Sequence, residues 1–276
     1  MNKKLVLRWA RAIVLIYALG GIFVYYLQDY ILLHPEPLPK EHKYPFEQPY
    51  RELNIPYTTS SSMNIIQFTT NKSPVKGVVL YFHGNSHNIS EYNHAAPLFT
   101  KHGYEVWMID YPGFGKSTGV FTEQRLYDWA LTFYKLARAR FAPDSIIIYG
   151  RSLGSGVAAQ LASIRDCRNL VLETPYYSIP SLFASYIPIY PFENLMTLKL
   201  RTGEYLKQVD APVLIFHGDD DNLIPLRNAR KLKPVLKPGS QFIEVENGGH
   251  NDLTVAPVVV AKLDSLLRLR DDTNRN

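Results

Sequence analysis

The sequence contains a single cysteine, Cys167, among its 276 residues. One cysteine excludes an internal disulfide and a zinc site built from paired cysteines. The chain also lacks a His-Glu-x-x-His motif and a glycine-rich phosphate loop. We therefore predict no metal, nucleotide or other cofactor.

Neither positive nor negative charge is in large excess. The formal net charge is +5, and much of it comes from four residues at the start of the chain, namely Lys3, Lys4, Arg8 and Arg11. Because no other basic run is interleaved with aromatic residues, we expect no nucleic-acid partner. Internal repeats and low-complexity segments are also absent. The length of the chain is typical of one large domain, and we expect the protein to be a monomer.

One long apolar run follows the basic start. Residues 12–28 carry no charge, and as a helix they would extend about 25 Å, at the short end of what crosses a bilayer. Aromatic residues flank the run as they do at membrane interfaces: Trp9, Tyr25, Tyr26 and Tyr30. We predict an uncleaved signal anchor over residues 1–33. The alternative is a cleavable secretory signal, for which Ala18-Leu19-Gly20 is an acceptable cleavage site.

The position of the basic residues predicts the orientation of this single-pass anchor. Basic residues before the apolar run favour a cytoplasmic N-terminus, which places the rest of the chain on the far side: periplasmic, lumenal or extracellular. Residues 34–50 contain five prolines, which disfavour a helix and favour an extended, semi-rigid connector. We expect the globular domain over residues 51–270 and a polar tail over residues 271–276.

The pattern beyond residue 50 is typical of a sheet wound by helices. Two segments, 53–58 and 63–69, are expected to pair as antiparallel strands. Six short apolar runs then predict strands that are covered on both faces, at residues 78–82, 104–109, 146–149, 170–172, 213–216 and 242–245. Helical patterns lie between them, the clearest over residues 122–140. The predicted fold class is therefore α/β, with a mostly parallel eight-stranded sheet, helices on both faces and functional residues at the carboxyl ends of the strands.

The segment Ser145–Gly156 carries the strongest local signal. It consists of a short strand, a Gly-x-Ser-x-Gly sequence and the start of a run rich in alanine and leucine. Such a strand–turn–helix projects the hydroxyl of Ser152 away from the backbone. Gly150 and Gly154 remove the Cβ atoms that would collide where strand and helix approach each other. Ser152 is therefore the candidate nucleophile.

A serine nucleophile needs a base and a carboxylate that orients the base. His250 lies in a glycine-flanked loop after the last predicted strand and is the candidate base. The chain order serine, acid, histidine is expected for this kind of turn. Asp221, in the stretch His-Gly-x-x-Asp-x-x-Ile-Pro, is the preferred acid, and Asp219, Asp220 and Glu173 are alternatives.

The oxyanion of a tetrahedral intermediate needs backbone donors. We predict that the N–H groups of Asn85 and Leu153 supply them. His83 and His217 also follow strands directly. We interpret both as residues that shape their loops by hydrogen bonding rather than as catalytic groups.

Six motifs follow the predicted strands: Tyr-Phe-His-Gly-Asn at 81–85, Asp-Tyr-Pro-Gly-Phe-Gly-Lys-Ser at 110–117, Gly-Arg-Ser-Leu-Gly-Ser-Gly at 150–156, Leu-Glu-Thr-Pro at 172–175, His-Gly-x-x-Asp-x-x-Ile-Pro at 217–225 and Gly-Gly-His-Asn at 248–251. Together they resemble the alpha/beta-hydrolase superfamily, and within it the membrane-anchored alpha/beta-hydrolase-domain serine hydrolases. The resemblance covers nearly the whole chain after the connector. It departs at Ser60-Ser61-Ser62, where relatives tend to have an Asp-Gly turn. It implies a serine hydrolase of esters, thioesters or amides, and says little about the substrate.

Residues 174–207 occupy the position of a short cap after the sixth strand and are rich in aromatic and aliphatic residues. Such a cap either lines an acyl pocket or simply packs over the sheet. Together with the membrane anchor, it favours a lipid-like or acyl substrate. We predict cleavage of a carboxylic ester or thioester through a Ser-His-Asp triad and an acyl-enzyme. The alternatives are an acyltransferase or amide hydrolase with the same triad, and a non-catalytic membrane-tethered scaffold.

Overall fold

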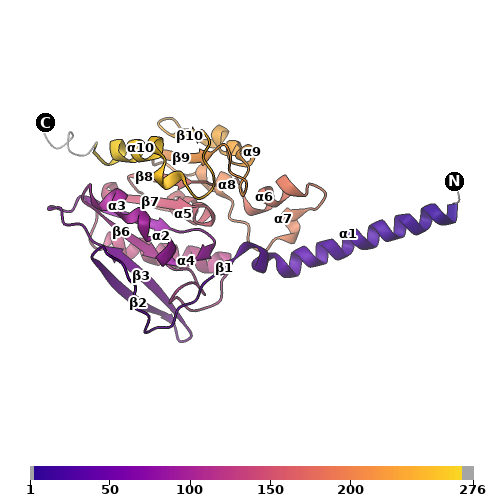
Figure 1. Cartoon of the computed structure of the whole chain (residues 1–276), viewed down its shortest axis with the longest axis horizontal. Coiled ribbons are helices and arrows are strands. Elements are labelled where there is room, and N and C mark those ends of the chain that lie inside the picture. The colour runs from indigo at the N-terminus through magenta and orange to yellow at the C-terminus, as the bar shows by residue number, and fades with distance from the viewer. Residues whose placement is uncertain (1–2, 269–276) are drawn as a thin grey trace.

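The computed structural model describes residues 3–268 of the chain. At its centre lies an eight-stranded sheet with the strand order β10-β9-β8-β7-β4-β6-β3-β2 (Figure 1). The pairs β2–β3 and β3–β6 are antiparallel, and the other neighbouring pairs are parallel. This confirms the predicted mostly parallel eight-stranded sheet. Its strands are β2 (Tyr50–Thr58), β3 (Ser61–Phe68), β4 (Gly77–Phe82), β6 (Tyr104–Ile109), β7 (Ile146–Arg151), β8 (Asn169–Glu173), β9 (Val213–Gly218) and β10 (Gln241–Val245).

Helices cover both faces of the sheet. Val78 and Leu80 of β4 pack in one hydrophobic cluster with α4 (Glu123–Arg138), α5 (Leu153–Ile164) and α8 (Thr202–Leu206). Val79 and Tyr81 pack in a second cluster with α3 (Ala96–Thr100) and α10 (Pro257–Arg268). A strand buried on both faces has no polar side to alternate with, which explains the continuous apolar runs in the sequence. The remaining short helices are α2 (Ile89–Tyr92), η1 (Asn93–Ala95), η2 (Pro143–Ser145), α9 (Leu226–Ala229), η3 (Arg230–Val235) and η4 (Leu253–Val255).

The helix α4 follows directly from its sequence. Thr122 caps its N-terminus, where the side-chain oxygen accepts a hydrogen bond from the Arg125 N–H at 3.1 Å. The apolar residues at helical spacing, among them Leu126, Trp129 and Phe133, are buried against the sheet. This buried face accounts for the orientation of the helix, since burial of each large side chain contributes about 1.5–3 kcal/mol.

The N-terminal helix α1 (Lys3–Leu32) stands apart from the sheet and projects from the domain as one continuous helix (Figure 1). Its 30 residues extend about 45 Å, and it is long and apolar enough to cross a membrane. Most of its side chains are exposed, whereas Gln28 and Leu32, near its C-terminal end, are buried. The end of the helix at Leu32 is therefore packed into the domain.

The proline-rich segment after α1 contains no helix, as its composition predicts, but it does not act as a free spacer. Its first residues form β1 (His34–Pro35), which pairs in parallel with β5 (Ser86–His87). Further along, Tyr44 is buried, and its hydroxyl donates to Asn64 Oδ1 at 3.1 Å. The segment thus packs along the domain because its aromatic residues have apolar surface to cover. Residues 1–2 of the expected anchor, and the expected polar tail at 271–276, lie outside the described residues.

The cap lies between β8 and β9. It consists of α6 (Ile179–Tyr186), α7 (Phe192–Leu195), α8 and the segments that join them. In Figure 1, α6 and α7 lie next to the end of α1 that enters the domain. The cap and α1 therefore meet above the carboxyl ends of the central strands.

Candidate active site

The nucleophile candidate lies at the junction of a central strand and a helix. Ser152 stands between β7 and α5, with φ 50° and ψ −118°, a conformation that few residues with a side chain adopt. A Cβ on Gly154 would lie 2.1 Å from the Phe82 carbonyl oxygen, and one on Gly150 would lie 2.5 Å from the Gly154 carbonyl oxygen. Both glycines therefore permit the close approach of strand and helix that the sequence predicts.

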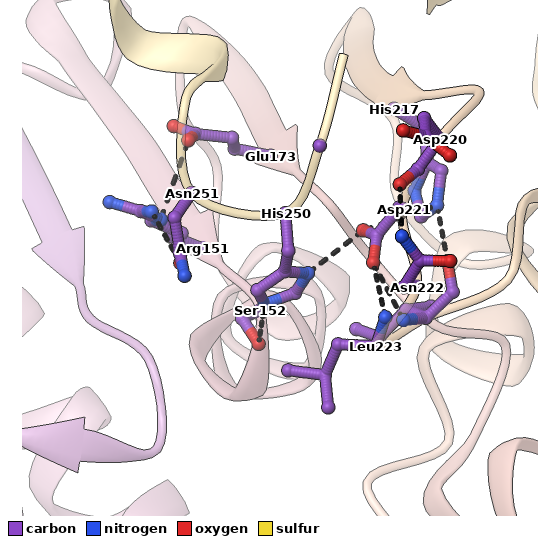
Figure 2. Close-up of polar contacts among 12 residues, drawn as sticks. Arg151, Ser152, Glu173, His217, Asp220, Asp221, Asn222, Leu223, His250 and Asn251 are labelled. Carbon is purple, nitrogen blue, oxygen red and sulfur yellow. Dashed lines mark hydrogen bonds and ion pairs between the residues drawn. The ribbon is translucent and has the colours of Figure 1, made fainter. Parts of the chain in front are cut away.

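The structure brings Ser152, His250 and Asp221 together from three different loops (Figure 2). His250 Nε2 lies 3.0 Å from Ser152 Oγ, and His250 Nδ1 lies 2.8 Å from Asp221 Oδ2. These distances are within hydrogen-bond reach. With Nδ1 donating to the carboxylate, Nε2 is the nitrogen free to accept the serine proton.

Backbone groups hold the Asp221 carboxylate in place. Its Oδ1 accepts hydrogen bonds from the N–H groups of Leu223 at 2.9 Å and Ile224 at 2.7 Å. Burial alone would raise the pKa of Asp221, but the hydrogen bond and charge of His250 and the Ile224 N–H together outweigh burial and lower it. Asp221 is therefore ionised at neutral pH. The neighbouring Asp219 and Asp220 are exposed.

Asn85 and Leu153, the residues expected to stabilise an oxyanion, line the same cavity as Ser152. Leu153 is the first residue of α5, and the N–H groups of a first helical turn have no acceptor within their helix. The side chain of Asn85 donates to the Leu32 carbonyl at 2.6 Å. The loop that carries Asn85 is thereby tied to the end of α1.

Two buried histidines have structural partners. His83 Nδ1 lies 2.8 Å from the Gly84 carbonyl oxygen, and its Nε2 lies 3.3 Å from Asp110 Oδ1. His217 Nε2 lies 2.8 Å from the Ile224 carbonyl oxygen. These contacts fix the Asn85 loop and the Asp221 loop, which agrees with the interpretation of both histidines as loop-shaping residues.

His217 makes the stability of the protein depend on pH. Burial, the largest cause, lowers the pKa of His217 below its ordinary value. The unfolded chain therefore binds a proton at a pH where the folded chain does not. The contribution of His217 to the free energy of unfolding is fully present above the ordinary histidine pKa. Below that pKa it is lost, by at most about 1.4 kcal/mol per pH unit, until the pH reaches the pKa of His217 in the folded protein.

We expect His217→Gln to remove this dependence on pH, because the glutamine amide can donate to the Ile224 carbonyl without titrating. Urea unfolding of the full chain in detergent at pH 7.5, 6.5 and 5.5 measures the effect. The exposed His94 provides the control, since His94→Gln should retain the wild-type slope. Equal slopes for wild type and His217→Gln would contradict the assignment.

A polar network of Arg151, Asn251 and Glu173, which the sequence analysis missed, lies beside Ser152 and His250 (Figure 2). Arg151 Nη2 donates to Asn251 Oδ1 at 3.1 Å, and Arg151 Nε lies 3.4 Å from Glu173 Oε1. Burial, the largest influence, lowers the pKa of Arg151, but the charge of Glu173 and the influence of three nearby tyrosines, Tyr81, Tyr92 and Tyr149, together outweigh it, and the net pKa is raised. Glu173 also accepts a hydrogen bond from Tyr149. Arg151, the residue before Ser152, is thus bonded to Asn251, the residue after His250, and Glu173 is its counter-ion.

A cavity of about 560 Å³ opens from Ser152, within the usual range for ligand pockets. Its lining is mostly aliphatic and aromatic and comes from four places in the chain. These are α1 (Gly20, Phe23, Val24, Ile31, Leu32), the loops after β4 and β7 (Asn85, Ser152, Leu153), the cap (Tyr176, Ile179, Leu182, Phe183, Tyr186, Ile187, Tyr190, Phe192) and the Asp221 loop (Leu223, Ile224). The cap lines the pocket, as one of the two readings of its sequence predicts. Sequence analysis missed the contribution of α1, which it treated only as an anchor.

Over residues 3–268, no group of three or more His, Cys, Asp or Glu side chains is placed to hold a metal ion.

Comparison with known proteins agrees with the fold. A family model described as serine aminopeptidase, S33, matches residues 73–201. The lysophosphatidylserine lipase ABHD12 of Macaca fascicularis is 30% identical over 190 residues, which cover 60% of this chain and 46% of the relative. Human protein ABHD12B is 28% identical over 181 residues, which cover 58% of this chain and 50% of the relative. The chain thus spans about half the length of the curated relatives it matches.

Solved structures share the fold at low sequence identity. An esterase from Pyrococcus furiosus superposes with a TM-score of 0.65 at 16% identity, over 86% of this chain and 97% of the esterase. The ferulic acid complex of Est1E from Butyrivibrio proteoclasticus superposes with a TM-score of 0.60 at 17% identity, over 78% of this chain and 97% of Est1E. The sheet topology and these matches agree with the six motifs. The chain therefore has the alpha/beta-hydrolase fold, and its sequence is similar to that of serine hydrolases with this fold.

Proposed function

We propose that the protein hydrolyses a carboxylic ester or thioester of a lipid-like acyl substrate through Ser152, His250 and Asp221. The observation that carries the proposal is that Ser152 Oγ, His250 and Asp221 are joined by hydrogen bonds. Ser152 also lines a mostly apolar cavity. The name of the relative ABHD12, a lysophosphatidylserine lipase, supports a lipid ester as the substrate class.

The geometry suggests the order of events. His250 Nε2 takes the proton of Ser152 as Oγ attacks the substrate carbonyl, and Asp221 stabilises the imidazolium that forms. The N–H groups of Asn85 and Leu153 stabilise the oxyanion. His250 then gives the proton to the departing alcohol or thiol, which leaves an acyl-enzyme on Ser152. Water, activated in turn by His250, releases the acid and restores the serine.

Amide hydrolysis is a weaker candidate, although the matching family model is described as an aminopeptidase. An aminopeptidase must bind the charged amino group of its substrate, and a carboxylate would favour such a group electrostatically. Among the described residues that line the cavity, none is aspartate or glutamate. The lining therefore favours an uncharged acyl chain.

We also propose that α1 anchors the protein in a membrane, with residues 1–33 as anchor, 34–50 as connector and 51–270 as the catalytic domain. The contacts of the second half of α1 with the cap support retention of the helix rather than its cleavage as a signal. The basic N-terminus favours a cytoplasmic N-terminus and a catalytic domain on the far side. Protease protection of sealed membrane vesicles tests the orientation, and digestion of the domain from the cytoplasmic side would contradict it.

A panel of nitrophenyl esters tests the proposed activity. We expect the full chain in detergent to hydrolyse octanoate and decanoate esters with kcat/KM at least tenfold above that for acetate. Burial of each additional methylene contributes up to about 0.8 kcal/mol, so a few buried methylenes suffice for this preference. Exclusive hydrolysis of acetate would contradict the acyl substrate, and absence of hydrolysis across the panel would contradict the esterase.

A further inference from the structure

One face of the membrane helix lines the cavity that contains Ser152. Gly20, Phe23, Val24 and Ile31 of α1 all border this cavity. Their spacing of three, one and seven residues places them on one stripe of a helix. Cap residues such as Leu182 and Phe183 also line the cavity. The cavity is therefore bounded on one side by the helix that is expected to lie in the bilayer.

We propose that α1 is part of the substrate site, and that the acyl chain of a membrane lipid enters from the hydrocarbon layer and lies between α1 and the cap. This inference rests on the proposed esterase function and specifies its substrate as a lipid that stays in the bilayer. It also assigns α1 a second role besides anchoring.

Specific contacts hold α1 against the cap. The rings of Tyr17 and Tyr190 stack with centroids 4.7 Å apart and planes 11° apart. Their hydroxyls bond across the junction, that of Tyr190 to the Tyr17 carbonyl and that of Tyr17 to the Ile189 carbonyl, each at 3.1 Å. A Cβ on Gly20 would lie 2.1 Å from Tyr190 Oη. A larger residue than glycine at position 20 would displace this ring.

A buried amide makes a second contact nearer the domain. The side chain of Gln28 is 2% exposed, and its Oε1 accepts a hydrogen bond from the Thr197 N–H at 2.7 Å. A polar side chain that is satisfied by the cap fixes both the rotation and the height of the helix, because any other placement would leave it buried and unpaired. The pocket-lining stripe is thus held toward the cap.

The contacts also place part of the cap at the depth of the membrane. Tyr17 precedes Gln28 by eleven residues, which is about 16 Å along the helix and about half the thickness of a hydrocarbon layer. Tyr190, which stacks on Tyr17, therefore lies about as deep in the hydrocarbon layer as Tyr17 does. Beside it, Ile187 is 44% and Ile189 is 66% exposed. Exposed apolar residues next to a membrane helix are expected to lie in the hydrocarbon, so the opening between α1 and the cap faces lipid tails rather than water.

Filling the cavity from the α1 side tests the proposal. The full chain is reconstituted in phosphatidylcholine vesicles that contain a nitrophenyl palmitate, and nitrophenyl acetate is the water-soluble reference. An acetyl group needs only the space next to Ser152, whereas a palmitoyl chain must continue along α1. We expect Val24→Trp to lower the ratio of palmitate to acetate hydrolysis at least tenfold. Ile22→Trp adds the same side chain to α1 at an exposed position outside the cavity lining, and it should keep the wild-type ratio.

A second variant separates filling of the cavity from loosening of the helix. Leu182→Trp fills the same cavity from the cap and should lower the ratio as Val24→Trp does. Equal ratios for Val24→Trp, Ile22→Trp and wild type would overturn the role of α1, while hydrolysis of acetate by the wild type would leave the esterase standing. Absence of acetate hydrolysis by the wild type would instead contradict the esterase and, with it, this inference.

Discussion

Ser152→Ala is expected to lower ester turnover by about 10⁴- to 10⁶-fold and to abolish labelling by a fluorophosphonate probe. The probe forms a covalent bond only with an activated nucleophile, and we propose that the hydrogen bond of 3.0 Å to His250 Nε2 activates the hydroxyl. Alanine leaves His250 and Asp221 in contact with each other but removes the attacking atom. Gel fluorescence after probe treatment and nitrophenyl ester hydrolysis measure the two effects.

A serine on the helix that follows Ser152 provides the control for this variant. Ser163 lies near the other end of α5, and its hydroxyl donates to the Gln160 carbonyl at 2.7 Å. Ser163→Ala should keep both labelling and turnover within about twofold of wild type, because a small substitution away from the candidate catalytic residues has little effect on them. Labelling that persists in Ser152→Ala would overturn the assignment of the nucleophile.

Asp221→Asn is expected to lower kcat by about 10³- to 10⁴-fold. The two N–H groups of Leu223 and Ile224 that bond Oδ1 will select the amide oxygen of the asparagine. The NH₂ group then faces His250 Nδ1 and can only donate to it. This favours the histidine tautomer with its proton on Nε2, which cannot accept the proton of Ser152.

The run of three aspartates offers matched controls for this prediction. Asp219→Asn and Asp220→Asn make the same chemical change at exposed positions, so we expect kcat within about twofold of wild type. Thermal melts of all three variants check that each is folded. A loss for Asp220→Asn as large as that for Asp221→Asn would show that the acid had been assigned to the wrong residue.

The local elements of the site could be predicted because their causes are local. Four apolar strand residues before Gly150, and the glycine spacing around Ser152, are steric requirements that a short stretch of sequence expresses by itself. The same holds for the apolar face of α4 and for the uncharged run of α1. Parallel topology could be predicted as well, since strands buried on both faces have no polar alternation.

The role of α1 at the cavity could not be predicted in this way. A run that is apolar on every side shows no periodicity, so the sequence does not mark the face of α1 that meets the cap. The residues that do mark it, Gly20 and Gln28, have ordinary alternative explanations in a membrane helix. Only their contacts with Tyr190 and Thr197 reveal which way the helix faces.

The sequence by itself thus determined the fold class, the strand–turn–helix at Ser152 and the presence of an apolar helix long enough to cross a membrane, because each depends on neighbours within a few residues. Tertiary structure alone decided which carboxylate meets His250, how Arg151 joins Asn251 to Glu173, and that α1 lines the pocket. Each of these contacts joins residues far apart in the chain, and the closure of the loops and the packing of side chains select them.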